Sequence, residues 1–138
     1  MTTILVIEDQ AIIRANLLEL LEEEGFNAVG FERGFTGMMW ALKHIPDLII
    51  CDIMMPDMDG YNVLNELNHY PTMATVGFIF LSAKADKPSV REGMDLGADV
   101  YVTKPFKRTK LLEAINVCLE KQAAVNQALK LELPSDQI

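Results

Sequence analysis

The fold of this chain is decided by a stretch in the first half of its sequence, Leu48-Ile49-Ile50-Cys51-Asp52-Ile53-Met54-Met55-Pro56-Asp57-Met58-Asp59-Gly60. It begins with a short, unbroken apolar run, the pattern of a strand buried on both faces of a parallel sheet. Asp52 ends the run, so its carboxylate is predicted at the edge of the sheet. Pro56 and Gly60 then favour a turn, which places Asp52 where open α/β sheets bind ligands. Aspartates also end strands for turn chemistry alone, and this stretch by itself leaves both interpretations open.

Four further segments share the short apolar pattern of the central strand, which is predicted over Asp47 to Asp52. They are Thr3 to Ile7, Asn27 to Phe31, Val76 to Leu81 and Val100 to Val102. Between these segments the apolar period changes to that of a helix. Strands that alternate with helices predict a parallel sheet with helices on both faces, because parallel strands need crossover connections. The predicted fold class is therefore α/β, a doubly wound, flavodoxin-like parallel sheet of five strands.

Each of the longer predicted helices presents one apolar face to the sheet. The faces comprise Ile13, Leu17, Leu20 and Leu21; Phe35, Met38, Met39 and Leu42; Tyr61, Val63, Leu64 and Leu67; and Leu111, Ile115, Cys118 and Leu119. The methionines of the second face are interpreted as core residues. Gly25 is a predicted C-cap, and Asp86 and Pro88 are predicted to start a short helix. Asp57 and Asp59 are interpreted as capping and turn residues.

Length and composition indicate one globular domain. The chain has 138 residues, of which half are hydrophobic, and a formal net charge of -8. This acid excess argues against nucleic-acid binding, which needs clustered Lys and Arg. The apolar runs are too short to span a membrane and no leader pattern precedes the first strand, so we expect a cytoplasmic location. Cys51 and Cys118 lie in a strand pattern and a helical apolar stripe, which favours reduced core thiols.

The carboxyl ends of the parallel strands bring Glu8, Asp9, Asp52, Ser82 and Lys104 to one edge of the predicted sheet. Three neighbouring carboxylates either raise their pKa values or recruit a cation. Oxygen ligands without a nearby His or Cys suit Mg²⁺. Such a set is suited to phosphoryl transfer: Asp52 attacks phosphorus, the metal and Lys104 neutralise the phosphoryl oxygens, and Ser82 donates a hydrogen bond. No general base is required, because a carboxylate is already deprotonated at neutral pH.

Over about residues 3 to 121 the chain resembles the receiver domain of two-component response regulators. The motifs that carry the resemblance are Glu8-Asp9, Asp52 with Met55-Pro56-Asp57-Met58-Asp59-Gly60, Ser82-Ala83-Lys84, Gly97-Ala98-Asp99 and Lys104-Pro105-Phe106. The resemblance implies the strand order 2-1-3-4-5. It also implies that Asp52 accepts a phosphoryl group from a phosphohistidine of a sensor histidine kinase or a histidine phosphotransfer protein. Such a domain is not an enzyme in the usual sense, because it catalyses only its own phosphorylation and slow dephosphorylation.

The same resemblance implies a metal site. Asp9 and Asp52 would bind Mg²⁺ directly, the backbone carbonyl of Met54 would be a further ligand, and Glu8 would act mainly through water. The side chain of Met54 stands at a variable position of the family that faces the water attacking the phosphoryl group. We expect this apolar side chain to slow dephosphorylation, since it cannot position water.

A switch pair is also implied by the resemblance. The hydroxyl of Ser82 would move toward the phosphoryl group, and the ring of Tyr101 would follow into the space vacated. Taken alone, Ser82 would be interpreted as a cap or turn residue and Tyr101 as a half-buried strand aromatic. The Lys104–Pro105 peptide bond is expected to be cis.

Three alternative functions account for parts of the pattern. A phosphatase with an aspartyl-phosphate intermediate normally has a second acid two residues after its nucleophile, where this chain has Met54. A nucleotide-binding domain is disfavoured because no glycine-rich loop follows the first strand. A receiver-like interaction module that is not phosphorylated usually lacks an acid, the nucleophile or the lysine, and all of these are present here.

We divide the chain into a receiver domain over residues 1–121 and an extension of the last helix with a disordered tail over residues 122–138. A heptad-like spacing crosses this boundary, with apolar or neutral residues four and three apart at Leu111, Ile115, Cys118, Gln122, Val125 and Leu129. In one interpretation the first three pack on the sheet and the rest of the helix frays. In the other, the helix extends to about Leu131 and either forms a homodimer or leads into an output domain.

Overall fold

The computed structural model describes residues 1–132, with side chains through residue 128. Its centre is a sheet of five parallel strands in the order β2-β1-β3-β4-β5. The strands are β1 (Thr3–Ile7), β2 (Asn27–Phe31), β3 (Leu48–Cys51), β4 (Gly77–Ser82) and β5 (Val100–Thr103). The predicted fold class and the strand order implied by the resemblance are both confirmed.

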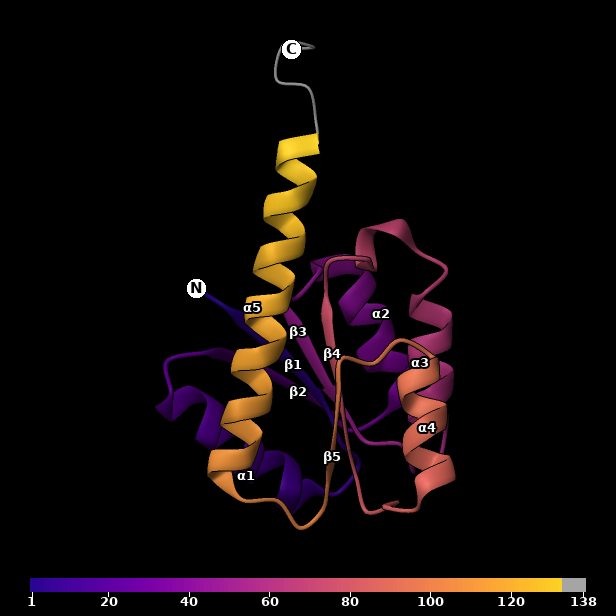
Figure 1. The fold of residues 1–138 in the computed structure, drawn as a ribbon. Coiled ribbons are helices and arrows are strands. Elements are labelled where there is room, and N and C mark those ends of the chain that lie inside the picture. The colour runs from indigo at the N-terminus through magenta and orange to yellow at the C-terminus, as the bar shows by residue number, and fades with distance from the viewer. Residues whose placement is uncertain (133–138) are drawn as a thin grey trace.

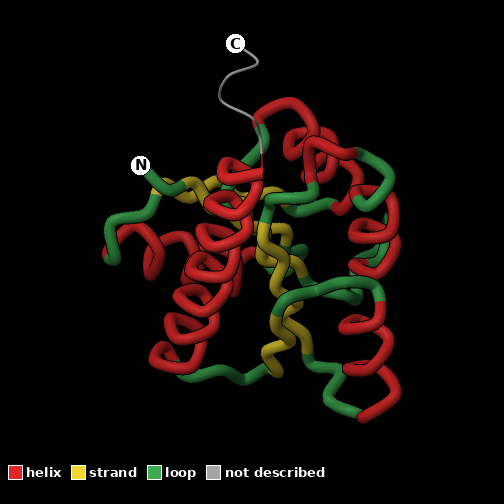
Figure 2. The backbone as a smooth tube through the Cα atoms, turned by 45° about the horizontal axis from the view of Figure 1, so that its top comes forward, coloured by secondary structure: helices red, strands yellow, loops and turns green. Residues whose placement is uncertain are grey.

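Helices cover both faces of this sheet (Figures 1 and 2). They are α1 (Ala11–Glu23), α2 (Gly34–His44), α3 (Gly60–Leu67), α4 (Lys87–Asp95) and α5 (Arg108–Glu132), with a short 3-10 turn, η1, at Pro71–Met73. The helices α1 and α5 lie on one face, and α2, α3 and α4 lie on the other (Figure 1). This is the doubly wound arrangement that right-handed crossovers produce.

The core consists of two apolar layers separated by the sheet. In β1, Ile4 and Val6 face the layer that contains α1 and α5, whereas Leu5 and Ile7 face the layer that contains α2 and α3. All four are fully buried, which explains why the strand shows no polar alternation. Cys51 and Cys118 are buried and unpaired, as the sequence predicts for reduced core thiols.

The predicted capping residues are confirmed, except that Asp57 caps a different helix from the one that follows it in the sequence. Gly25 has a φ of +88° just past α1, a backbone conformation that favours glycine. Asp59 and Asp86 accept hydrogen bonds from the backbone amides three residues later, at the starts of α3 and α4. Asp57 instead caps a helix distant in sequence, because its carboxylate accepts from the amides of residues 34 and 35 at the start of α2.

The predicted inner face of α2 is wrong at two positions. Phe35 and Met39 are 55% and 49% exposed. The buried side is formed by Gly37, Met38 and Ala41 together with the first residue of the helix. A Cβ atom at Gly37 would collide with the side chain of Ile7, so the helix lies unusually close to β1. This close approach needs the small residues inward, and it rotates the two larger ones toward solvent.

The last helix extends well beyond the sheet. It runs to Glu132 and projects past the other elements (Figure 1). The structure therefore agrees with the interpretation in which this helix continues to about Leu131. The disorder predicted from Leu133 onward lies outside the described residues. Among residues 1–132, no helix combines the length and apolarity that crossing a membrane requires.

Candidate functional site

Four charged residues predicted for the site meet at the carboxyl edge of the sheet. Glu8 and Asp9 follow β1, Asp52 follows β3, and Lys104 follows β5. The Lys104 ammonium lies 2.5 Å from Glu8 Oε1 and 3.1 Å from Asp52 Oδ2. One carboxylate oxygen of each of the three acids lies within 4.8 Å of the others. The topology thus joins groups separated by up to 96 positions in the sequence.

The orientation of Asp52 is set by its own loop. Its Oδ1 accepts a hydrogen bond of 2.7 Å from the amide of Ile53 and a longer one of 3.4 Å from Met54. The loop then folds back so that the amide of Gly60 donates to the carbonyl of Ile53 at 2.8 Å. A Cβ atom at Gly60 would collide with the backbone of Asp52 and Ile53, so only glycine permits this approach. The second oxygen of Asp52 remains turned toward Lys104.

Burial shapes the electrostatics of this edge. Glu8 is 1% exposed and Asp52 is 6% exposed. Burial raises the pKa of Glu8 to about 7, although the hydrogen bond from Lys104 acts in the opposite direction. Burial also works against the charge on Lys104, but hydrogen bonds to Glu8 and Asp52 outweigh it and raise the lysine pKa. The acids therefore outnumber the cation that compensates them.

The three carboxylates are placed so that they could hold a metal ion. Within the described part of the chain, Asp9 Oδ1 is buried and accepts no hydrogen bond. A buried acceptor without a partner is costly, and a cation would satisfy it. The donor set contains only oxygen, which suits hard cations rather than zinc or copper. The residues present thus fit a hard divalent cation.

Ser82 and Tyr101 are linked through the backbone of Lys84. Ser82 is fully buried at the end of β4, and its Oγ accepts a hydrogen bond from the amide of Lys84 at 3.3 Å. The Tyr101 hydroxyl donates to the carbonyl of Lys84 at 2.6 Å. Burial raises the pKa of the Tyr101 phenol further above its ordinary value, which is already well above neutral, so the hydroxyl is a hydrogen-bond donor. The two side chains of the predicted switch pair therefore bind the amide and the carbonyl of the same residue, Lys84.

Met54 is the predicted site residue that lies farthest out. Its side chain is 59% exposed. It borders an open hollow of about 420 Å³ whose lining includes Asp9, Tyr61 and Lys84. The hollow gives a small group access from solvent to Asp9, which lies beside Glu8 and Asp52. The expected cis peptide bond between Lys104 and Pro105 is present.

Two residues of this region were not predicted from the sequence. Arg14 extends from α1 and donates to the backbone carbonyl of Glu8 at 2.8 Å. Tyr61, assigned only to the core, donates through its hydroxyl to the carbonyl of Ser89 at 2.8 Å. Neither contact has a local sequence signal, because each depends on the approach of a separate element. A polar atom on an otherwise apolar helix face is the only hint that Tyr61 offers.

Residues 4–116 match the family described as the response regulator receiver domain. The chain belongs to this family. This receiver domain is 34% identical over 117 residues to the chemotaxis protein CheY of Bacillus subtilis, covering 84% of this chain and 96% of CheY. It is also 34% identical over 134 residues to the transcriptional regulatory protein KdpE of Mycobacterium tuberculosis, covering 97% of this chain and 57% of KdpE. The chain thus spans little more than half of that regulator.

Solved structures show the same fold for this receiver domain. A response regulator receiver domain protein from Clostridium thermocellum has a TM-score of 0.84 at 26% identity, covering 91% of this chain and 99% of that one. The receiver domain of a signal transduction histidine kinase from Syntrophus aciditrophicus has a TM-score of 0.80 at 31% identity, covering 88% and 92%. Receiver domains are signalling domains of two-component systems, and this chain is one of them.

Proposed function

We propose that this receiver domain accepts a phosphoryl group on Asp52 from a phosphohistidine of a sensor histidine kinase or a histidine phosphotransfer protein. The observation that carries the proposal is the position of Asp52. Its carboxylate lies among the acids at the carboxyl edge of the sheet. Backbone amides donate to one of its oxygens, and Lys104 contacts the other. The groups that this proposal assigns as nucleophile, counter-charge and metal ligands lie close together, which supports it.

In the proposed reaction, an oxygen of Asp52 forms the new bond to phosphorus while the P–N bond of the phosphohistidine breaks. The imidazole nitrogen keeps the electron pair of that bond. Lys104 neutralises charge on the phosphoryl oxygens, because its ammonium already lies between Glu8 and Asp52. Ser82 donates a hydrogen bond to the transferred group when its hydroxyl turns from the amide of Lys84.

We propose Mg²⁺ as the metal of the site. Asp9, Asp52 and the backbone carbonyl of Met54 would hold it directly, and Glu8 would act mainly through water. The orphaned oxygen of Asp9 supports this assignment. When bound, the ion supplies positive charge that offsets the acids and polarises the phosphoryl oxygens. The chain's own residues orient the acceptor, through the amide of Ile53 on one oxygen and Lys104 on the other.

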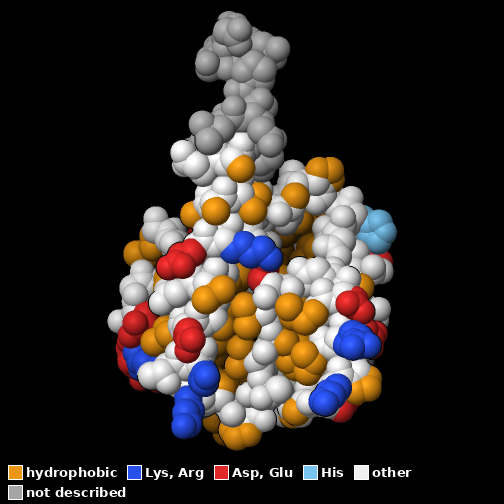
Figure 3. All heavy atoms as spheres, in the orientation of Figure 1, with side chains coloured by type: hydrophobic (Ala, Val, Ile, Leu, Met, Phe, Trp, Pro, Cys, Tyr) orange, Lys and Arg blue, Asp and Glu red, His pale blue; other side chains and the backbone are white. Residues whose placement is uncertain are grey.

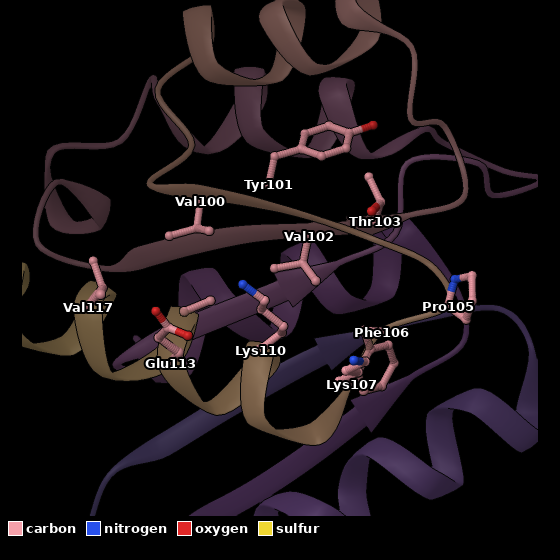
Figure 4. A pocket seen from close by; sticks show the side chains of 11 residues that line it. Val100, Tyr101, Val102, Thr103, Pro105, Phe106, Lys107, Lys110, Glu113 and Val117 are labelled. Carbon is pink, nitrogen blue, oxygen red and sulfur yellow. The ribbon is translucent and has the colours of Figure 1, made fainter.

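The state of Asp52 would be reported to a partner on the face that presents Tyr101. A groove of about 550 Å³ lies beside this residue, between β5 and α5. Figure 3 shows apolar side chains gathered in this hollow, and Figure 4 shows the residues that line it. A downstream protein, or an output domain in a longer chain, would read the change here.

Intact mass tests the phosphoacceptor. The chain is incubated with Mg²⁺ and acetyl phosphate, and one added phosphoryl group is expected. Asp52→Asn should abolish the addition, and so should chelation of the metal. Asp57→Asn is the matched control, because this acid lies in the same loop but caps α2 and should remain dispensable for modification. Absence of modification in the wild type would overturn the proposal and favour a receiver-like interaction module that is not phosphorylated.

We also propose that the projecting part of α5 mediates dimerisation. Residues of this segment that are described, such as Ala124 and Val125, are exposed. A single helix extending into water gains little stability from its own hydrogen bonds, whereas pairing would bury its apolar side. Phosphorylated chain is compared with unmodified chain by light scattering, and a doubled mass on phosphorylation is expected. Truncation after Glu120 that leaves the mass of the phosphorylated form unchanged would count against this route.

A further inference from the structure

A row of three aromatic rings crosses the layer beneath α4. Tyr61 of α3 and Phe80 of β4 have ring centroids 5.5 Å apart, and Phe80 and Tyr101 of β5 have centroids 5.9 Å apart. Phe80 is fully buried and Tyr61 is 8% exposed. The row therefore connects α3 to β5 through the middle of the core.

The tyrosines at the ends of this row are bonded to α4 and to the loop before it. The Tyr61 hydroxyl donates to the carbonyl of Ser89 at 2.8 Å, and the Tyr101 hydroxyl donates to the carbonyl of Lys84 at 2.6 Å. The amide of Lys84 in turn donates to Ser82 Oγ at 3.3 Å. Three hydrogen bonds thus hold two residues of this region, Lys84 through its amide and its carbonyl and Ser89 through its carbonyl.

Because α4 buries few residues, these hydrogen bonds contribute a large share of what holds the helix in place. Of its nine residues, only Ser89 and Gly93 are buried. Gly93 lies directly against Phe80 and Tyr101, where an added Cβ atom would approach the two rings to 2.9 and 3.2 Å. A helix that buries so little apolar surface is weakly held by the hydrophobic effect. Hydrogen bonds therefore contribute much to its position: the two tyrosine hydroxyls act near its start, and Asn68 of the α3 C-cap donates to the carbonyl of Leu96 at its end at 2.8 Å.

We propose that Tyr61 is a positioning residue of the switch, whose hydroxyl bond to Ser89 holds α4 in the arrangement that keeps Tyr101 packed inward against Phe80. The state of the phosphoacceptor then reaches α4 through two tyrosines. Figure 4 shows Tyr101 directed away from Lys110 and Glu113 of α5, which agrees with its contact to the opposite layer. This inference rests on the proposed function, because phosphorylation of Asp52 is what sets the switch.

Tyr61→Phe tests the inference, since it removes the hydroxyl and keeps the ring. Amide hydrogen exchange over residues 87–95 of the unmodified chain should become about threefold to tenfold faster, the range expected for one net hydrogen bond. Exchange in β3 and β4 should stay as in the wild type. Tyr101→Phe should act in the same direction. Tyr70→Phe is the matched control, because Tyr70 is 45% exposed and lies outside the row.

A second measurement distinguishes a role of Tyr61 in the switch from a purely structural role. Beryllofluoride, a mimic of the phosphoryl group, is titrated into each variant with Mg²⁺. Because coupling between two sites is reciprocal, Tyr61→Phe should weaken binding of the mimic several-fold, by no more than the roughly tenfold bound on one hydrogen bond. Tyr70→Phe should bind it as the wild type does.

Unchanged exchange in α4 would overturn the inference, and so would an equal acceleration in β3 and β4, which indicates general destabilisation. Faster exchange in α4 with unchanged affinity for the mimic would also overturn it, because Tyr61 would then be only structural. Failure of the wild-type chain to bind the mimic is a different result. It would contradict the proposed function before any variant is compared.

Discussion

The two edges of the sheet each hold an aspartate that contacts a lysine, buried Asp52 at the carboxyl edge and half-buried Asp99 at the amino edge, and the contrast between them separates structure from function. At the amino edge, Asp99 Oδ2 accepts from the amide of Phe78 at 2.8 Å, and its Oδ1 lies 3.0 Å from Lys121. Both oxygens have partners, and among the described residues Asp99 belongs to no group of three or more possible metal ligands. This carboxylate is fully used in joining β4 to α5.

The carboxyl edge is built in the opposite way. Three acids lie close together, Lys104 contacts two of them, Glu8 and Asp52, and Asp9 keeps a buried oxygen without a partner within the described residues. At the amino edge, both oxygens of the Asp99 carboxylate have partners, so its charge is tolerated. At the carboxyl edge, the hydrogen bonding of the acids is incomplete, because one oxygen of Asp9 has no partner in the described part of the chain. The incomplete edge has the acids that could hold a cation, and it is the one that we propose accepts the phosphoryl group.

The largest difference in phosphorylation rate is expected between variants of the two lysines, Lys104 and Lys121. Lys104→Ala should lower the rate of phosphorylation by acetyl phosphate by about 100-fold to 1000-fold, the usual cost of removing one preorganised group that stabilises a transition state. Lys121→Ala should leave the rate unchanged, because this lysine lies at the other edge. Rates are followed by intact mass. Equal rates in the two variants would remove the distinction between the edges.

A pH dependence should belong to the carboxyl edge alone. The folded chain raises the pKa of Glu8 from 4.5 to about 7, so the folded state holds this proton more tightly than the unfolded state. Stability of the metal-free chain should therefore fall as pH rises from about 4.5 to 7, by about 3 kcal/mol. Urea denaturation across this range measures the slope, and Glu8→Gln should flatten it. At the amino edge, burial raises the pKa of Cys118 to about 12, outside this range. A slope that persists in Glu8→Gln would point to another group.

Stability should respond in opposite directions to loss of the two aspartates. Asp99→Ala leaves the buried amide of Phe78 without a partner and should cost about 1–3 kcal/mol. Asp52→Asn removes one of three crowded charges and should raise the stability of the metal-free chain. Chemical denaturation without Mg²⁺ compares the two variants with the wild type. A larger loss for Asp52→Asn than for Asp99→Ala would show that the carboxyl edge is the structural one.

The smallest effect, a change in dephosphorylation rate, is expected at Met54, beside the acids of the carboxyl edge. Met54 is exposed and apolar, so it cannot position the water that attacks an aspartyl phosphate. Met54→Asn should speed dephosphorylation by a few-fold, consistent with one added hydrogen bond. Decay of the phosphorylated form is followed by mass after the phosphodonor is removed. Met94→Asn is the control, because Met94 is 42% exposed on α4, away from the acids. An equal or slower rate in Met54→Asn would contradict this role.

The sequence predicted the elements well where the signal is local. Apolar runs located all five strands, and capping residues such as Asp59 and Asp86 marked helix starts. It was wrong on the face of α2, where Phe35 and Met39 fit a helical period equally well as buried residues. The sequence period gives the width of an apolar stripe, but the neighbouring strand decides which part of the stripe is covered.

The composition of the candidate site was also accessible from the sequence. Glu8, Asp52 and Lys104 follow strand patterns directly, and parallel strands must collect their carboxyl ends at one edge. Their separations and the orphaned oxygen of Asp9 were not accessible, because they depend on how the loops fold back. The link from Asp57 to α2 and the bond from Tyr61 to Ser89 were likewise hidden by long sequence separation.

By itself, the sequence determined which chemical groups this receiver domain carries to the edge of its sheet. Strand pattern and side-chain chemistry are local properties, and each can be recognised within a few residues. Only the tertiary structure decided which carboxylates are satisfied, as Asp99 is, and which are left open, as Asp9 is. That difference depends on partners contributed by distant elements, since a hydrogen bond requires a distance and an angle that no local pattern encodes.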